Sequence, residues 1–128
     1  MLHPRLGRLP AHDIGAGAAV LEAARVRPRL LGLAGLRPRD LPRRHALLLR
    51  PCSSVHTFGM RFPIDVVFAD ARGRVLRVVR DVPAGRVLRC PGAALAIESH
   101  AGDATAFLEG GRGAGARLRP RIPRGGQA

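Results

Sequence analysis

Residues 52–70 read CSSVHTFGMRFPIDVVFAD, and this stretch decides the fold of the chain. Its second half, residues 64–69, alternates between apolar side chains on one face of a predicted strand and Asp65 on the other. Residues 70–73 then form a tight connection that ends in a glycine, and a second alternating run follows at 74–80. The pattern predicts a β-hairpin.

Further short elements are predicted on both sides of this hairpin. Two short helices are expected, at about 28–34 and 103–109, because a proline suits the first turn of the one and an aspartate caps the other. Short apolar runs bounded by turn residues predict strands at about 20–24, 46–50, 86–90, 94–99 and 117–119. Many short strands with few helical residues indicate a mostly β fold, either a small antiparallel β-barrel or a rolled sheet.

The length of 128 residues suits one domain. Residues 1–17 show no periodicity and are expected to form a flexible basic arm. Residues 18–111 form the predicted β-rich domain. Residues 112–128 are rich in Gly, Arg and Pro and are expected to be a tail, with a short last strand near 117–119.

The charge of the chain is concentrated at its ends. The formal net charge is +13, and the basic residues are all arginine. Residues 1–45 carry a net +6 and residues 112–128 a net +5, whereas residues 46–111 carry only +2. Basic ends attract phosphate groups without sequence preference. Because the chain has no Tyr or Trp to stack on bases, this charge predicts at most non-specific nucleic-acid binding through the termini.

The sequence also predicts the cellular location of the protein and the redox state of its cysteines. No apolar run reaches the ~18 residues that a membrane span needs, and no signal-peptide core follows the N-terminal charges. Two cysteines, Cys52 and Cys90, are too few for a disulfide framework. We therefore expect a cytoplasmic protein with reduced thiols, and a transient Cys52–Cys90 disulfide stays open as an alternative.

The run CSSVHTFGMRFPIDVVFADARGRV, followed by VPAG and ALAIESHAG, resembles domain-of-unknown-function family 192 (DUF192) of bacteria and archaea. The resemblance spans about residues 20–111. One branch of the family also opens with Cys-x3-His-Thr, as Cys52, His56 and Thr57 do here. The other residues that carry the resemblance are Phe58, Met60, Pro63, Asp65, Val66, Val67, Phe68, Glu98, Ala101 and Gly102. It implies a small β fold and brings no assigned activity.

Two carboxylates lie inside predicted strands, Asp65 and Glu98. A carboxylate within an apolar strand must find a partner or face water. Together with Thr57 and Arg61, and close to His56, they could line a polar pocket that selects a small ligand. A non-catalytic binding or accessory domain is therefore the leading interpretation. For Asp65 alone, the alternative is a structural role, accepting backbone N–H bonds from the loop at 58–61.

Cys52, His56 and Met60 are spaced as C-x3-H-x3-M, which suggests a metal site. Thiolate, imidazole and thioether are the donors that copper prefers. Such a site also needs a second histidine, for which the candidates are His3, His12, His45 and His100. No cofactor is the main expectation, and copper is the alternative.

The same stretch also offers residues for hydrolysis or acyl transfer. Cys52 or Ser54 could be the nucleophile, His56 the base, and Asp65 or Glu98 the group that orients it. The sequence has neither a nucleophile elbow nor a Gly-rich oxyanion loop beside Cys52. We therefore expect that the protein is not an enzyme, and a Cys/His-dependent hydrolase remains an alternative.

Overall fold

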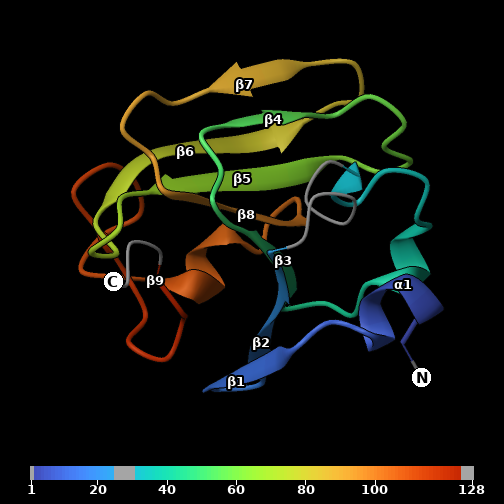
Figure 1. The fold of residues 1–128 in the computed structure, drawn as a ribbon, viewed down its shortest axis with the longest axis horizontal. Helices are drawn as coiled ribbons and strands as arrows, with labels where there is room; N and C mark the ends of the chain where they lie inside the picture. The colour runs from blue at the N-terminus through green and yellow to red at the C-terminus, as the bar shows by residue number, and fades with distance from the viewer. Residues whose placement is uncertain (1, 25–30, 125–128) are drawn as a thin grey trace.

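The computed structural model describes residues 2–24 and 31–124. Within them, six strands form one mixed sheet of order β1-β2-β3-β8-β5-β6 (Figure 1). The β2–β3 pair is parallel and the other neighbours are antiparallel. The strands of this sheet are β1 (Ala11–Gly15), β2 (Ala18–Ala23), β3 (His45–Leu49), β5 (Ile64–Ala69), β6 (Val75–Val82) and β8 (Leu95–His100).

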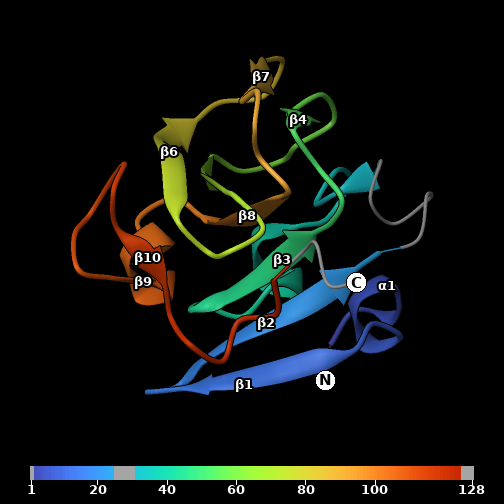
Figure 2. The same ribbon diagram turned by 60° about the vertical axis from the view of Figure 1, so that its left-hand side comes forward.

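Smaller elements complete the described chain. Two further strand pairs are antiparallel: β4 (Ser54–His56) with β7 (Val87–Arg89), and β9 (Leu108–Glu109) with β10 (Arg117–Leu118). The helical turns are α1 (Pro4–Gly7) and the 3-10 helices η1 (Pro38–Asp40) and η2 (Ala104–Phe107). Figures 1 and 2 both place the β4–β7 ribbon at the end of the molecule away from β1.

The hairpin predicted around residues 70–73 is confirmed, since β5 and β6 are paired through this turn. The Asp70 N–H donates to the Arg74 carbonyl at 2.9 Å, and Gly73 has φ +84°. Only a residue without Cβ adopts that φ at little cost. The five other predicted strands are confirmed to within two residues, as β2, β3, β7, β8 and β10.

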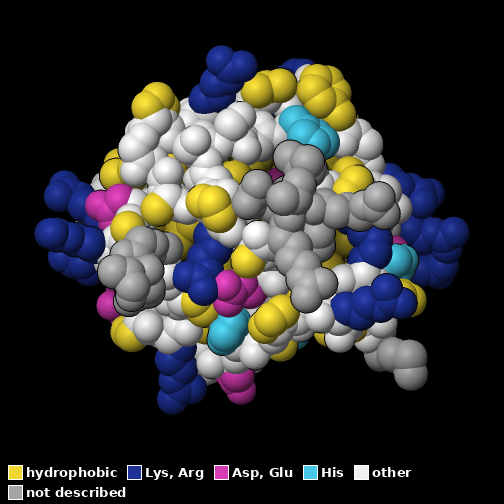
Figure 3. Space-filling view, viewed as in Figure 1, with side chains coloured by type: hydrophobic (Ala, Val, Ile, Leu, Met, Phe, Trp, Pro, Cys, Tyr) yellow, Lys and Arg dark blue, Asp and Glu magenta, His cyan; other side chains and the backbone are white. Residues whose placement is uncertain are grey.

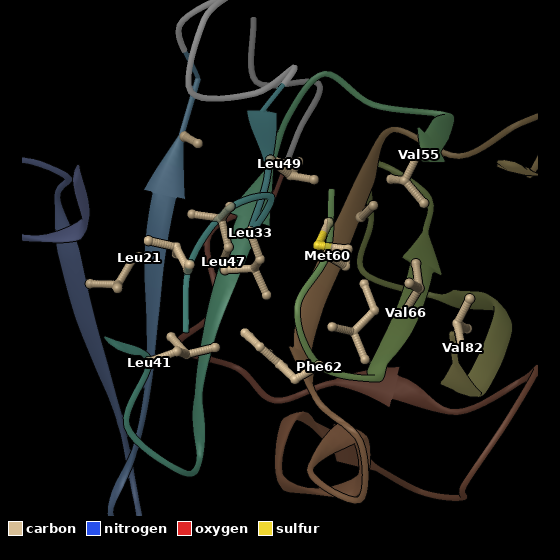
Figure 4. Close-up of a cluster of buried hydrophobic side chains, with 14 of the residues drawn as sticks. Leu21, Leu33, Leu41, Leu47, Leu49, Val55, Met60, Phe62, Val66 and Val82 are labelled. Atoms are coloured by element: carbon tan, nitrogen blue, oxygen red, sulfur yellow. The ribbon is translucent and has the colours of Figure 1, made fainter. Parts of the chain in front are cut away.

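The sheet is buried on both faces. All six residues of β5 and all six of β8 are buried, which is typical of central strands covered on two sides. One face carries the first core cluster, in which leucines of β2 and β3 meet Met60, Phe62 and Val66 (Figure 4). The other face carries the second core cluster, which includes Val67, Phe107 and Leu118.

The mostly β prediction is confirmed, but the barrel is not formed. In the described residues the sheet is open, because the outer strands β1 and β6 do not pair with each other. Because β2 and β3 are parallel, the sheet is mixed. Two parallel neighbours need a crossover connection between them rather than a hairpin. Short runs between turn signals fit open and closed sheets equally well, so the pattern could not separate them.

The two predicted helices have different outcomes. In place of a helix at 103–109, η2 makes a single 3-10 turn, because Leu108 is already extended and pairs with Leu118. The helix predicted at 28–34 falls partly on residues 25–30, which lie outside the described residues. In the part that the structure describes, no helix is long and apolar enough to cross a membrane.

Both ends of the chain hold more structure than the sequence indicated. Within the predicted arm, α1 and β1 place Leu6 and Ile14 in the core, at 2% and 3% exposure. Within the predicted tail, Leu118 and Ile122 pack in the second core cluster. Isolated apolar residues between Gly, Arg and Pro give no periodic signal, which is why these segments were expected to be loose. The domain boundaries at 18 and 111 remain a prediction.

Candidate functional site

Asp65 is buried in the middle of β5, where three backbone N–H groups donate to its carboxylate. Oδ1 accepts from Asp81 at 2.9 Å, and Oδ2 accepts from Gly102 at 2.9 Å and Ala104 at 3.1 Å. The carboxylate therefore fastens the end of β6 and the start of η2 to the central strand. These bonds fit the structural alternative for Asp65, although their donors are not in the loop at 58–61.

The predicted pocket needs Asp65 and Glu98 on one face of the sheet, and the register places them on opposite faces. Asp65 lies directly opposite Ser99, and Val66 lies opposite Glu98. Residues that face each other on paired strands project to the same side, and their chain neighbours project to the other. Glu98 therefore lies on the side of the first core cluster with Val66, and Asp65 lies on the side of the second.

Thr57 and Arg61 are not brought to Glu98 either. Thr57 is buried, and its hydroxyl donates to the Pro83 carbonyl at 2.7 Å and accepts from the Arg86 N–H at 2.8 Å. These bonds hold the turn between β6 and β7. Arg61 is exposed on the loop before β5. The four residues of the predicted pocket thus lie in separate places.

Glu98 instead lines a cavity of about 210 Å³ together with residues from the start of the 52–70 stretch. Four of the residues singled out in the sequence meet there: Cys52, Ser54, His56 and Glu98. The segment leading into β4 is held in place because the Cys52 N–H donates to the Ala94 carbonyl at 3.0 Å. The full lining is Gly32, Leu49, Pro51, Cys52, Ser53, Ser54, Val55, His56 and Glu98.

The Glu98 carboxyl group is almost entirely buried, with 1% exposure. Oε1 accepts one hydrogen bond, from the Leu33 N–H at 3.2 Å, and no cation of the described residues pairs with it. Burial raises the pKa of Glu98 to about 7, and the Leu33 N–H offsets only part of this effect. Near neutral pH the group therefore exchanges between a neutral hydrogen-bond donor and a charged acceptor.

The loop that contains Gly32 and Leu33 covers this carboxyl group. Gly32 has φ +54°, and a Cβ there would lie 2.6 Å from Glu98 Oε1. The Arg5 guanidinium holds the loop from outside, donating to the carbonyls of Gly32 at 2.8 Å and Ala34 at 2.6 Å. Neither Gly32 nor Arg5 belongs to a recognisable motif, so the sequence did not indicate that they lie at this loop.

The hydrogen bonds of His56 and Cys52 indicate how these two side chains can act. His56 Nδ1 accepts the Phe58 N–H at 3.2 Å, so in the neutral ring Nε2 carries the proton. The Cys52 thiol donates to the Ser54 carbonyl at 3.2 Å. A base for a thiol needs a nitrogen that accepts, and a nucleophilic cysteine is a thiolate. Through these bonds both side chains are held against the local backbone.

The copper hypothesis finds only two of its three residues at the cavity. Cys52 and His56 line it, whereas Met60 is buried in the first core cluster (Figure 4). Within residues 2–24 and 31–124, no three His, Cys, Asp or Glu side chains are grouped closely enough to hold a metal ion. None of the candidate second histidines, His3, His12, His45 and His100, lines the cavity.

The two cysteines are not joined in a disulfide. Cys90 is buried and its N–H donates to the Ser53 carbonyl at 2.8 Å, which places it beside the segment that carries Cys52. The alternative of a Cys52–Cys90 bridge is thus not realised in this structure.

The open mixed sheet and the Glu98 cavity define a small, mostly β domain with a buried carboxyl group at a surface cavity. The chain belongs to the DUF192 family, described as "Uncharacterized ACR, COG1430", whose profile matches residues 12–119. The resemblance found in the sequence is therefore confirmed. The assignment to the Cys-x3-His-Thr branch remains a prediction.

Two crystal structures share this fold. One is a protein of unknown function from Novosphingobium aromaticivorans, with a TM-score of 0.68 and 17% identity over 92% of this chain and 90% of the other. The second is described as a "putative transcription regulator" from Sinorhizobium meliloti, with a TM-score of 0.66 and 19% identity over 79% and 80%. At these identities the likeness shows the fold alone. A search of curated proteins gave no match.

Proposed function

We propose that this chain is a non-catalytic binding domain and that its ligand site is the Glu98 cavity. One observation carries the proposal: the Glu98 carboxyl group, with 1% exposure and no cation beside it among the described residues, lines a cavity together with Cys52 and His56. A buried carboxyl group is costly unless its oxygens are hydrogen-bonded. A ligand with an N–H or O–H group could donate to the Glu98 carboxylate where it lines the cavity.

The size and lining of the cavity support a small, mostly neutral ligand. Its volume of about 210 Å³ is below the ~300–1,000 Å³ that is typical of pockets for drug-sized molecules. Ser53, Ser54 and His56 add polar groups, and Leu49 and Val55 add apolar wall. Small polyols and amides match this mixture, because they carry several donors on a short carbon frame.

The proposal is tested by NMR titration of the full chain with glycerol and with acetamide. We expect the backbone amide signals of residues 33 and 52–56 to shift with a saturable dependence on probe concentration. Glu98→Gln should weaken binding, whereas Glu109→Gln, an exposed glutamate on β9, should leave it unchanged. Shifts that are the same in both variants, or that map away from the cavity, would refute the proposal.

Copper binding and hydrolysis remain alternative proposals for the same cavity, because Cys52 and His56, which both would use, line it. Copper requires Met60 to leave the first core cluster, so a Cu(I) titration with Met60→Leu as the comparison decides it. Hydrolysis requires ester turnover that disappears in Cys52→Ala. A cytoplasmic location is also part of the proposal, supported by two cysteines that form no disulfide.

Nucleic-acid binding through the termini receives no support from the surface seen in Figure 3. On that face the arginine side chains lie in several separate groups, at the edges and nearer the centre, rather than in one continuous stripe. A stripe that follows a phosphate backbone is the usual footprint of such binding. Loss of heparin retention in a variant with Arg112→Gln and Arg117→Gln, which changes two exposed arginines and keeps Leu118 and Ile122 in the core, would test the remaining, non-specific form of the idea.

A further inference from the structure

A second cavity, of about 360 Å³, lies where the β1–β2 turn approaches η2. Figures 1 and 2 both show this turn and η2 at the same end of the molecule. We call it the arginine cavity, because two arginines are the cations of its lining: Arg44, Gly102, Asp103, Thr105, Ala106, Leu108 and Arg119. It does not share a lining residue with the Glu98 cavity.

Arg44 is fixed at this cavity by its backbone and by its side chain. Its N–H donates to Asp103 Oδ2 at 2.8 Å, and its carbonyl accepts the Ala19 N–H at 3.1 Å. Its guanidinium donates to the Ala16 carbonyl at 3.0 Å. Both bonded residues have positive φ, +61° at Arg44 and +55° at Ala16, and such strained backbone concentrates at ligand sites.

Arg119 is fixed in a similar way from the opposite wall. Nη1 donates to the Ala106 carbonyl at 3.0 Å and Nη2 to the Ile14 carbonyl at 2.6 Å. The side chain of Arg121 reaches the same turn, since a Cβ on Gly15 would lie 3.2 Å from Arg119 Nη2 and 3.9 Å from Arg121 Nη1. Three guanidinium groups thus surround one short turn.

These arginines keep their charge without a carboxylate partner. Among the described residues, neither Arg44 nor Arg119 forms an ion pair, and the carboxylate in the lining, Asp103, is already paired with Arg43 at 2.8 Å. A guanidinium has five N–H donors. Within the described chain Arg44 donates one N–H to a backbone carbonyl, which leaves four N–H groups. Arg119 donates two N–H groups to backbone carbonyls, which leaves three.

We propose that the arginine cavity binds a small molecule through its phosphoryl group, held between Arg44 and Arg119. The planar fork of arginine matches the oxygens of a phosphate, and two pre-positioned forks lose little freedom on binding. Thr105 also lines the cavity, and its hydroxyl, which accepts from Arg80 Nη1 at 3.4 Å, can donate a further hydrogen bond. A nucleic acid fits less well, because the chain has no Tyr or Trp on which bases could stack.

The test is a titration of the full chain with inorganic phosphate and with glycerol phosphate, at constant ionic strength set with chloride and followed by NMR. We expect saturable shifts of the amides of Ala16, Gly102 and Thr105. Arg44→Gln should weaken binding by about tenfold or more, since one charge-assisted contact is lost. Arg77→Gln is the matched control, because this exposed arginine on β6 also donates to a carbonyl, that of Arg89, and should bind as the parent does.

Other results would overturn the proposal. Equal weakening by Arg44→Gln and Arg77→Gln would show that phosphate follows the overall charge. Saturable binding of an oligonucleotide, with no effect of either phosphate compound, would assign the surface to nucleic acid instead. Arg119→Gln removes bonds to two carbonyls and can unfold the chain. If Arg44→Gln also unfolds, the shift map of the unmodified chain decides, and shifts spread over the surface would refute the site.

Discussion

Asp65 and Glu98 lie on opposite faces of the same sheet, although both are buried carboxyl groups on neighbouring strands. Asp65 on β5 faces Ser99, whereas Glu98 on β8 faces Val66. Asp65 receives three backbone N–H bonds and Glu98 receives one. The first therefore fastens backbone segments together, whereas the second is the carboxyl group to which we assign the ligand site, and their substitutions should behave differently.

Asp65→Asn should lower the free energy of unfolding by about 2–4 kcal/mol, because an amide replaces one accepting oxygen with a donor that faces backbone N–H groups. Urea denaturation followed by circular dichroism measures this loss. Asp81→Asn is the control: Asp81 is exposed and has φ +54°, a conformation that Asn tolerates. Asp81→Asn should change the free energy of unfolding by less than about 0.5 kcal/mol. A similarly small change for Asp65→Asn would contradict its role in fastening β6 and η2.

The Glu98 carboxyl should make stability fall as pH rises. Between the ordinary pKa of 4.5 and the folded value of about 7, the folded chain keeps a proton that the unfolded chain has lost. The free energy of unfolding therefore decreases through this window, by roughly 3 kcal/mol at most, and levels off above it. Glu98→Gln should remove this part of the pH profile, and Glu109→Gln should retain it. Identical profiles for the two variants would show that Glu98 titrates normally.

Gly32→Ala should destabilise the chain by more than the cost of its backbone conformation. A new Cβ would meet Glu98 Oε1 at 2.6 Å while φ is +54°. Gly85→Ala is the matched comparison, since Gly85 has φ +87° and nothing within 4 Å of its Cβ position. The comparison should lose about 1 kcal/mol, the usual cost of a left-handed alanine. We expect Gly32→Ala to lose at least ~1 kcal/mol more, as measured by thermal unfolding, and an equal loss would contradict the close approach.

Leu118→Ala should cost about 2–5 kcal/mol, the range for a buried leucine in a well-packed core. Leu118 has 0% exposure in the second core cluster, within the segment that the sequence suggested was a tail. Val87→Ala, at a side chain with 51% exposure on β7, serves as the control and should change stability by less than about 0.5 kcal/mol. A stability near that of the parent for Leu118→Ala would contradict the packing of Leu118 in the second core cluster.

The sequence predicted the elements whose side chains repeat. The alternation of Ile64, Val66 and Phe68 gave β5, and Asp70 to Gly73 gave the turn to β6, because both signals are local. Local patterns therefore sufficed for strands, turns and the faces of single strands.

The remaining features depend on contacts between distant residues. Whether Asp65 and Glu98 share a pocket is decided by the β5–β8 register, and a shift of one residue would exchange the faces. The Leu33 N–H and the Glu98 carboxyl are 65 residues apart, and Arg119 reaches the Ile14 carbonyl across 105 residues. No local spacing encodes such pairs, so both cavities could be found only in the folded chain.

The parallel pairing of β2 and β3 has one more consequence. Their connection must return along the sheet, and residues 31–36 of this return path cover Glu98. The amide proton of Leu33 is therefore a natural probe of the path, because its exchange with deuterated water requires the covering loop to lift away from the carboxyl group. Its exchange rate measures how often the Glu98 cavity opens, separately from any measurement of what enters it.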